Sequence, residues 1–324
     1  MLDRVANLEK APGSKNIHHW ADYIEMLALQ NTDKVVSEAD VIDRICERQD
    51  LGEANDIQAE IASSDDSKGD KNDLFIGDCY RQLDYRVSAF GDAYPFCVSE
   101  NHKVLQCKGK TNPLNRMYVF LLLAANLGNI NKVFKNEITK FFEFISLEAL
   151  RAYLPSNTRI INFGTHSEDG RYIGKLSKKI FNLAEDLRIG IHPGVIEGLD
   201  PHNVGDGGLD LVGYIPFNDN TDGILHIFCQ CACTEGWISK QHDCSEQSWT
   251  NKFKFTAILP HMVFIPFCYR NATGSWYDSL QIKRSILVDR VRLIDLINND
   301  QSIMVKFPDL PAVNQFLLEN ETIF

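Results

Sequence analysis

The chain has 324 residues, enough for one large domain or two smaller ones. Hydrophobic residues make up 44% of it and charged residues 24%, which is typical of a globular protein and excludes the fibrous and fully disordered classes. A formal net charge of −11 argues against a broad nucleic-acid-binding surface, although a local basic cleft stays compatible with it.

The N-terminal residues, the longest apolar run and the cysteine count indicate in which cellular compartment the protein is expected. The first twenty residues are polar and charged, and the longest apolar run, Val119–Ala125, is too short to cross a bilayer. We therefore expect a cytoplasmic protein that does not enter the membrane. Nine cysteines, an odd number, are scattered along the chain, which favours reduced thiols over a disulfide framework.

Residues 1–110 predict a mostly helical module. Apolar spacing favours a helix over 20–29, and Ser37 begins a second helix whose first four residues have the capping-box form. Residues 50–73 are acidic, contain Ser, Gly and Lys and have almost no aromatics, so an exposed flexible loop is expected there. The pattern then predicts a helix at 75–90 and short strands at 94–98 and 103–107.

Residues 111–324 predict a second domain. The expected elements are a buried helix at 115–127, helices at 130–153 and 175–187, a loop at 190–208, a strand hairpin at 209–216 and 224–233, a mainly helical segment at 237–253, a strand at 261–269 and a helix at 285–298. Helices and strands in this order indicate an α/β fold with a mixed central sheet flanked by helices.

The hairpin carries a carboxylate and an amide on neighbouring strands. The glycine-rich stretch 205–213 places Asp210 at the mouth of an apolar strand, and Gln230 lies midway along the next strand. Strand side chains alternate between faces, so Gln230 projects away from Cys229 and Cys231, and Asp210 can face the same way. Oxygen ligands on adjacent strands suit a hard divalent cation, for which the glycines leave room.

These residues resemble the catalytic core of the PD-(D/E)XK nuclease superfamily, nearest to its Mrr-like restriction endonuclease branch. The resemblance lies in Gly-Asp-Gly-Gly-Leu-Asp-Leu-Val-Gly, the hairpin, and Ile-Phe-Cys-Gln-Cys-Ala. The continuation over 231–240 is similar to bacterial nucleases of restriction and phage defence. The specific part covers roughly residues 130–270, and the fold implied is a restriction-endonuclease-like core.

The resemblance implies Mg²⁺-dependent hydrolysis of a phosphodiester, with Mn²⁺ as a substitute ion and DNA as the expected nucleic acid. Asp210 would be the principal metal ligand, Gln230 would take the position usually held by an acid, and the Cys231 carbonyl would complete the shell. Glu143 would bind the ion directly or through water. The N-terminal module would position the enzyme or bind a partner protein, and an oligomer is compatible with the sequence.

One residue departs from the family pattern. The family's lysine falls at Ala232, whose methyl group cannot neutralise an oxyanion. In one explanation the lysine has migrated, and Lys240 reaches back into the site on its flexible stem. In the other, the chain is a catalytically weak protein that binds nucleic acid or a partner on the same fold. A purely structural interaction protein is a third alternative, which the acidic net charge favours.

Each singled-out residue also has a plain structural interpretation. Asp206 and Asp210 could cap a turn, Gln230 could be a buried amide, and Glu143 could lie on a helix surface, with Glu185 or Glu197 in its role. Zinc is disfavoured for Cys229, Cys231 and Cys233, because zinc knuckles place two residues between thiolates and these cysteines have one. The basic clusters are most simply solvated faces, and they comprise Lys175, Lys178, Lys179, Arg188, Lys252, Lys254, Arg270, Lys283 and Arg284.

Overall fold

The computed structural model describes residues 4–8, 11–13, 16–50, 66–108, 112–164, 167, 170–299 and 310–318. No helix in these ranges combines the length and apolar character that crossing a membrane requires. The chain divides into two compact units. Unit 1 comprises Met1–Ile138, Phe267–Tyr277 and Met304–Phe324, and unit 2 comprises Thr139–Pro266 and Asp278–Ile303.

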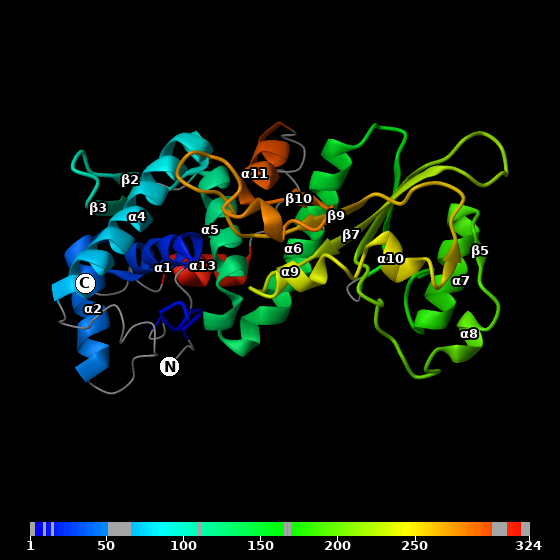
Figure 1. The fold of residues 1–324 in the computed structure, drawn as a ribbon, viewed down its shortest axis with the longest axis horizontal. Coiled ribbons are helices and arrows are strands. Elements are labelled where there is room, and N and C mark those ends of the chain that lie inside the picture. Colours follow the sequence, from blue (N-terminus) through cyan, green and yellow to red (C-terminus); the bar gives the residue numbers. More distant parts are fainter. Residues whose placement is uncertain are drawn as a thin grey trace. The chain divides into compact units, whose positions relative to one another are not determined.

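Unit 1 is mostly helical, as the sequence predicts for the N-terminal module, and it carries a small sheet of strand order β1-β3-β2 (Figure 1). Both strand pairs are antiparallel. Its elements are α1 (Ile17–Gln30), β1 (Val35–Ser37), α2 (Glu38–Asp50), α4 (Asp66–Phe90), η1 (Gly91–Ala93), β2 (Phe96–Val98), β3 (Val104–Cys107), α5 (Pro113–Ala125), η2 (Leu127–Asn129) and α13 (Pro311–Leu318).

The start of α2 follows the sequence closely. Ser37 Oγ accepts a hydrogen bond from the Asp40 backbone N–H at 3.2 Å, and Asp40 Oδ2 accepts one from the Ser37 N–H at 2.7 Å. This reciprocal pair is the predicted capping box. The loop expected at 50–73 is corrected in part. Residues 51–65 lie outside the described residues, and residues 66–73 belong to helix α4, which begins at Asp66.

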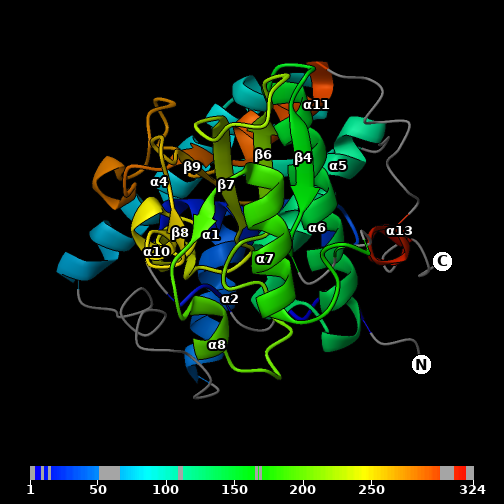
Figure 2. The ribbon, with the colours of Figure 1, turned by 90° about the vertical axis from the view of Figure 1, so that its right-hand side faces the viewer.

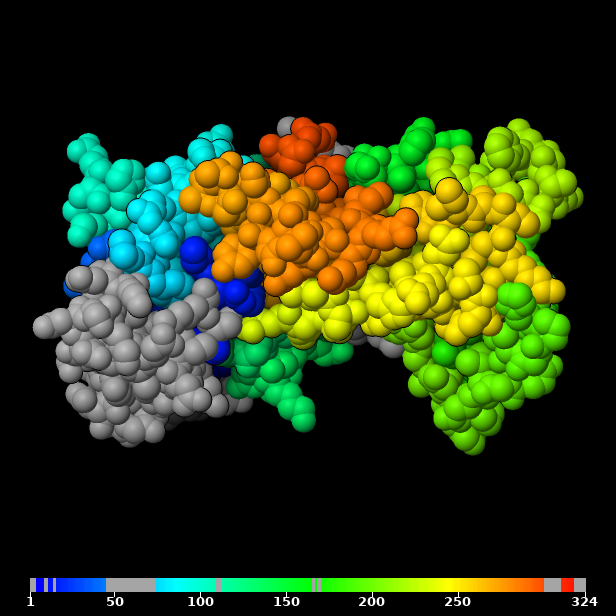
Figure 3. All heavy atoms as spheres, viewed as in Figure 1, coloured from blue at the N-terminus to red at the C-terminus, as the bar shows by residue number. Residues whose placement is uncertain are grey.

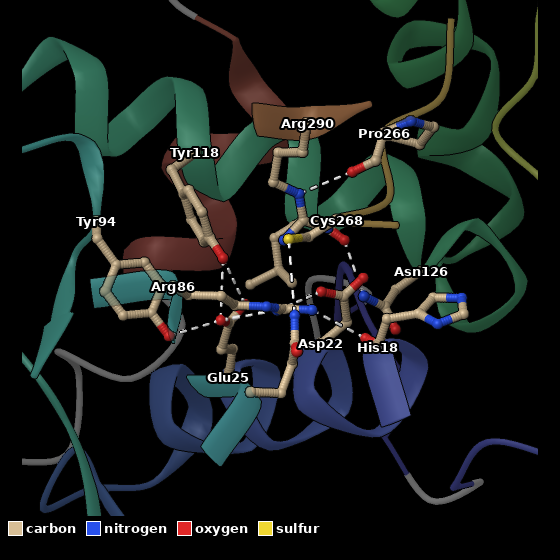
Figure 4. A network of polar contacts seen from close by, with 12 residues as sticks. His18, Asp22, Glu25, Arg86, Tyr94, Tyr118, Asn126, Pro266, Cys268 and Arg290 are labelled. Atoms are coloured by element: carbon tan, nitrogen blue, oxygen red, sulfur yellow. Dashed lines mark hydrogen bonds and ion pairs between the residues drawn. The ribbon is translucent and has the colours of Figure 1, made fainter. Parts of the chain in front are cut away.

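A buried charge network holds unit 1 together (Figure 4). The fully buried Arg86 of α4 pairs with Asp22 at 2.6 Å and Glu25 at 2.8 Å, both from α1. Glu25 also accepts hydrogen bonds from the hydroxyls of Tyr94, at 2.7 Å, and Tyr118, at 2.9 Å. The charges are therefore compensated in the interior, which buried carboxylates require.

Unit 2 is built on a five-stranded mixed sheet of order β10-β9-β7-β6-β4, and its strands β7, β6 and β4 lie side by side in Figure 2. β4, β6 and β7 are antiparallel neighbours, whereas β7, β9 and β10 run parallel. The strands are β4 (Arg159–Asn162), β6 (Leu211–Ile215), β7 (Leu225–Cys231), β9 (His261–Phe264) and β10 (Ile286–Val288). The predicted α/β class and the mixed sheet are confirmed.

Helices and a small second sheet complete unit 2. The helical elements are α6 (Lys132–Tyr153), whose first part belongs to unit 1, α7 (Leu176–Leu187), α8 (Val195–Gly198), α9 (Trp237–Lys240), α10 (Glu246–Trp249), η3 (Ser279–Gln281) and α11 (Arg290–Asn299). β5 (Gly190–Ile191) and β8 (Phe253–Lys254) form an antiparallel pair. The segment expected to be mainly helical at 237–253 thus contains two single turns.

Different elements cover the two sheet faces. A methyl group on Gly213 would lie 2.9 Å from Leu154 Cδ1, so the chain just after α6 packs closely against β6. On the other face, the Phe228 ring of β7 meets Trp249 of α10 edge-on, with ring centroids 5.3 Å apart. Gln230 belongs to the Phe228 face by alternation along β7, and Asp210 lies at the end of the sheet, just before β6.

The structure differs from the sequence prediction in the position of the domain boundary and in two strands. The units divide at 138/139, within α6, and not at 110/111, because the buried helix α5 packs with α1 and α13 of unit 1. β4 was missed, since four residues at a sheet edge give too short an alternation. Residues 286–288 form a strand, although the sequence predicted the start of a helix there. A short apolar run is compatible with either element, so its pattern could not distinguish them.

Candidate metal-binding site

The β6–β7 ladder ends at the pair Leu211 and Cys229, with Asp210 just before Leu211 and Gln230 just after Cys229. The Asp210 backbone N–H donates to the Cys229 carbonyl at 3.0 Å. Gln230 Nε2 donates to Asp210 Oδ2 at 2.7 Å, and the Cys231 backbone N–H donates to the same oxygen at 2.6 Å. Asp210 and Gln230 are 5% and 6% exposed, so this polar pair lies at the buried end of the hairpin.

Glu143 of α6 joins this pair. The Asp210 carbonyl accepts hydrogen bonds from the backbone N–H groups of Phe163, at 2.7 Å, and Gly164, at 2.9 Å, which fixes the chain after β4 beside Asp210. A methyl group on Gly164 would lie 3.2 Å from Glu143 Oε2 and 3.3 Å from Asp210 Oδ1. The two carboxylates therefore border one small space that the missing side chain of Gly164 leaves open.

Burial and neighbouring negative charges change the acidity of both carboxyl groups. Desolvation raises the pKa of Glu143 from 4.5 to about 7, with the Asp206 charge adding to the rise and Lys179 opposing it. Desolvation and the Glu143 charge also hold the pKa of Asp210 well above 3.8. A carboxyl pair that resists losing its protons in the absence of a cation is the electrostatic pattern of a functional site.

Asp206 and Asp243 lie at the edge of the same cluster. Asp206 Oδ1 accepts from the Gly208 N–H at 2.8 Å, which is the turn-capping role expected for it, while its charge acts on Glu143 and Asp210. Gly208 has φ +79°, and a Cβ there would lie 2.6 Å from the Cβ of Asp243. Only glycine fits this turn, so the glycine-rich stretch serves both backbone conformation and close packing.

Two lysines act on the carboxyl groups from different elements. Lys240, at the end of α9, lowers the pKa of Asp210 by its charge, although it is not the largest influence there. Lys179 of α7 is 2% exposed, donates to the Phe163 carbonyl at 3.3 Å, and interacts electrostatically with Glu143 and Asp206. Ala232, the position of the family's lysine, is fully buried.

Sequence reasoning placed Lys179 among solvated lysines and so missed it. The available signal was the helical period of α7: Leu176, Ile180 and Leu183 define its buried face, and Lys179 falls on the same side. A lysine on an apolar helix face requires a partner, because its ammonium group is costly to bury alone.

The alternative glutamates are not part of the cluster. Glu185 forms an ion pair with Arg171 at 2.9 Å and is 53% exposed, and Glu197 is exposed on the short helix α8. Burial raises the pKa of the Cys229 and Cys231 thiols of β7 well above 9.0, which opposes the thiolate form that binds zinc. The eight cysteines that the structure describes are all free thiols.

Comparison with known proteins gave no match: no protein-family model, no curated protein and no solved structure is significantly similar to this chain. The function is therefore argued from the site.

The donor atoms of the site fit a hard divalent cation better than a soft one. Within the described ranges, no three His, Cys, Asp or Glu side chains are grouped to hold a metal. The site instead offers two carboxylates and an amide, and an all-oxygen donor set of this kind suits Mg²⁺ better than zinc. Gln230 Oε1 is buried and finds no hydrogen-bond partner among the described residues. Together with the space above Gly164, this oxygen makes the residues compatible with a hard cation.

Proposed function

We propose that this protein is a Mg²⁺-dependent phosphodiesterase acting on nucleic acid, with DNA as the expected substrate. The observation that carries the proposal is the convergence of Glu143 and Asp210 on the space above Gly164, beside Gln230. The resemblance to the Mrr-like branch supports the same chemistry, a restriction-endonuclease-like core, and a role in restriction or anti-phage defence inside the cell.

Asp210 and Glu143 would hold the ion, and Gln230 would contribute its carboxamide oxygen. In the present arrangement Gln230 Nε2 faces Asp210, so half a turn about the last side-chain bond would exchange the nitrogen for Oε1. The Cys231 carbonyl accepts from Gln230 Nε2 at 3.3 Å, and the same half turn would release it as a further ligand. A bound Mg²⁺ would polarise a phosphodiester and lower the pKa of a nearby water.

Residues of the chain would manage charge and protons around the ion. With a pKa of about 7, Glu143 exists in both protonation states near neutral pH and can release its proton when a cation arrives. Lys240, at the end of α9, would supply the positive charge that Ala232 cannot supply. Lys179 would hold the chain at Phe163 in place and offset the Asp206 charge.

A second candidate is a protein that binds nucleic acid or a partner on this fold without cleaving. The specific observation in its favour is that Asp210 Oδ2 is already bonded by two N–H donors, as in a structural polar network. The absence of lysine at Ala232 points in the same direction.

The deciding experiment is cleavage of plasmid and single-stranded DNA with Mg²⁺, Mn²⁺ or EDTA. The account expects cleavage by the wild type that needs a divalent ion, and its loss in Asp210→Ala with the fold retained by circular dichroism. Glu197→Ala, an exposed glutamate of the same unit, is the matched control and should cleave normally. Equal cleavage by wild type and Asp210→Ala would refute the assignment.

A further inference from the structure

Unit 2 contains a pocket of about 750 Å³ that does not include the carboxyl cluster. It lies between the α9–α10 segment, the chain leading into β9, and the loop after η3; the first and last of these are side by side in Figure 3 in yellow and orange. Its volume is within the range of pockets for small ligands.

The pocket lining combines apolar and basic residues. Its apolar part includes Ile258, Leu259 and Pro260, and Ile258 is 79% exposed, so its side chain is accessible to a ligand. Lys283 and Arg284 supply two adjacent positive charges.

The basic loop is held rigidly. Gln241 is fully buried, and its Oε1 accepts hydrogen bonds from the Lys283 N–H at 2.9 Å and Ser285 Oγ at 2.6 Å. Its Nε2 donates to the Gln281 carbonyl at 2.8 Å. Arg284 has φ +58°, a conformation that costs a non-glycine residue energy and recurs at binding sites. Gln241 thus fixes the backbone that carries both cationic side chains, which reduces the entropy lost on binding an anion.

Polar groups for a neutral portion of a ligand are also present. His261 is 8% exposed and lines the pocket, and its Nε2 makes no hydrogen bond within the described part of the chain. His242 lines the pocket beside it, and burial together with the His242 charge lowers the pKa of His261. Glu246 adds an acceptor for hydroxyl or amino donors.

From this combination we propose that the pocket binds a nucleoside phosphate. The phosphate would lie against Lys283 and Arg284, the base would pack on Ile258 and its apolar neighbours, and Glu246 and His261 would meet the donors and acceptors of the sugar and base. The phosphate has two possible sources, a free mononucleotide or a nucleotide within a nucleic-acid strand.

The pocket is adjacent to the carboxyl cluster but separate from it. Ile238, Gln241 and His242 line the pocket, whereas the charge of Lys240 acts on Asp210. The α9 turn therefore has one side toward each site, and the binding proposal does not depend on cleavage activity.

The test measures binding by the full-length protein in EDTA. The probe is ADP carrying a fluorescent N-methylanthraniloyl group, followed by anisotropy and displaced by unlabelled ADP, inorganic phosphate or a ten-nucleotide single strand. Three variants are compared with wild type: the pair Lys283→Glu and Arg284→Glu, Ile258→Ser, and the control pair Lys175→Glu and Lys178→Glu. The control makes the same charge change at exposed positions of the same unit outside the pocket.

We expect the Lys283/Arg284 pair to weaken binding about tenfold or more, Ile258→Ser to weaken it about threefold, and the control pair to stay within about twofold. Displacement by unlabelled ADP identifies a free nucleotide, and displacement by the oligonucleotide alone identifies a strand; both support the proposal. Absence of binding, equal binding by all variants, or displacement by inorganic phosphate as effective as by ADP would overturn it. Asp210→Asn should bind as wild type does, which separates this result from the cleavage assay.

Discussion

Glu143→Gln should make the metal-free protein more stable at pH 8. Burial raises the pKa of Glu143 from 4.5 to about 7, so ionising it in the native state at pH 8 costs roughly 3 kcal/mol more than in the unfolded chain. Glutamine has nearly the same shape and no charge, and it also removes the repulsion on Asp210. Allowing for the lost attraction to Lys179, we expect a gain of about 1–3 kcal/mol.

The pH dependence gives the sign of this effect. The native state binds the Glu143 proton more tightly than the unfolded chain, so its contribution to stability is complete below about pH 4.5 and is lost as pH rises through about 7. The advantage of Glu143→Gln should therefore be large at pH 8 and shrink to less than about 1 kcal/mol at pH 5.

The assay is thermal unfolding in EDTA at both pH values, with Glu197→Gln as an exposed control from the same unit. At pH 8 the variant should melt on the order of 5 °C above wild type. Added Mg²⁺ should raise the melting temperature of wild type and have little effect on the variant, because the wild-type carboxylate gains a counter-charge. A variant that melts below wild type at pH 8 in EDTA would refute the argument, since Glu143 would then stabilise the fold by its charge.

Three other predictions concern single residues. Arg86→Met leaves Asp22 and Glu25 buried without their counter-charge, so urea unfolding should show the free energy of unfolding lowered by about 3–5 kcal/mol. The control Arg81→Met, at an exposed position of the same helix, should lower it by less than about 0.5 kcal/mol. Gly164→Ala places a methyl group 3.2 Å from Glu143 Oε2, so it should abolish Mg²⁺ binding, measured by calorimetry, while the protein remains folded; retained affinity would exclude this space as the ion's position. Lys240→Ala should lower kcat for DNA cleavage more than it changes KM, and an unchanged kcat would remove Lys240 from the mechanism.

Strong local patterns predicted much of the fold. The alternation and the glycine-rich turn located the β6–β7 hairpin, and the capping box at Ser37 placed the start of α2 within one residue. The short strands β4 and β10 were missed or misassigned, because their pairing partners lie far away in sequence and local periodicity over three or four residues carries little information.

The site was predictable in part for the same reason. Asp210 and Gln230 share a hairpin, so register and alternation bring them together from local sequence alone. Glu143 was proposed only from the resemblance to the nuclease family. The role of Gly164 could not be predicted, because Gly164 follows strand β4, which the sequence pattern did not reveal. Lys179 was overlooked since only the packing of α7 buries its ammonium group.

The most direct test is a crystal of the protein soaked in Mn²⁺, with the ion located by its anomalous scattering. The account predicts one peak within ligand distance of Asp210 and Glu143, above Gly164, with Gln230 turned so that its carboxamide oxygen faces the ion. The peak should be absent from crystals of Asp210→Asn. A fully occupied Mn²⁺ elsewhere, or no peak beside Asp210 at saturating Mn²⁺, would contradict the account.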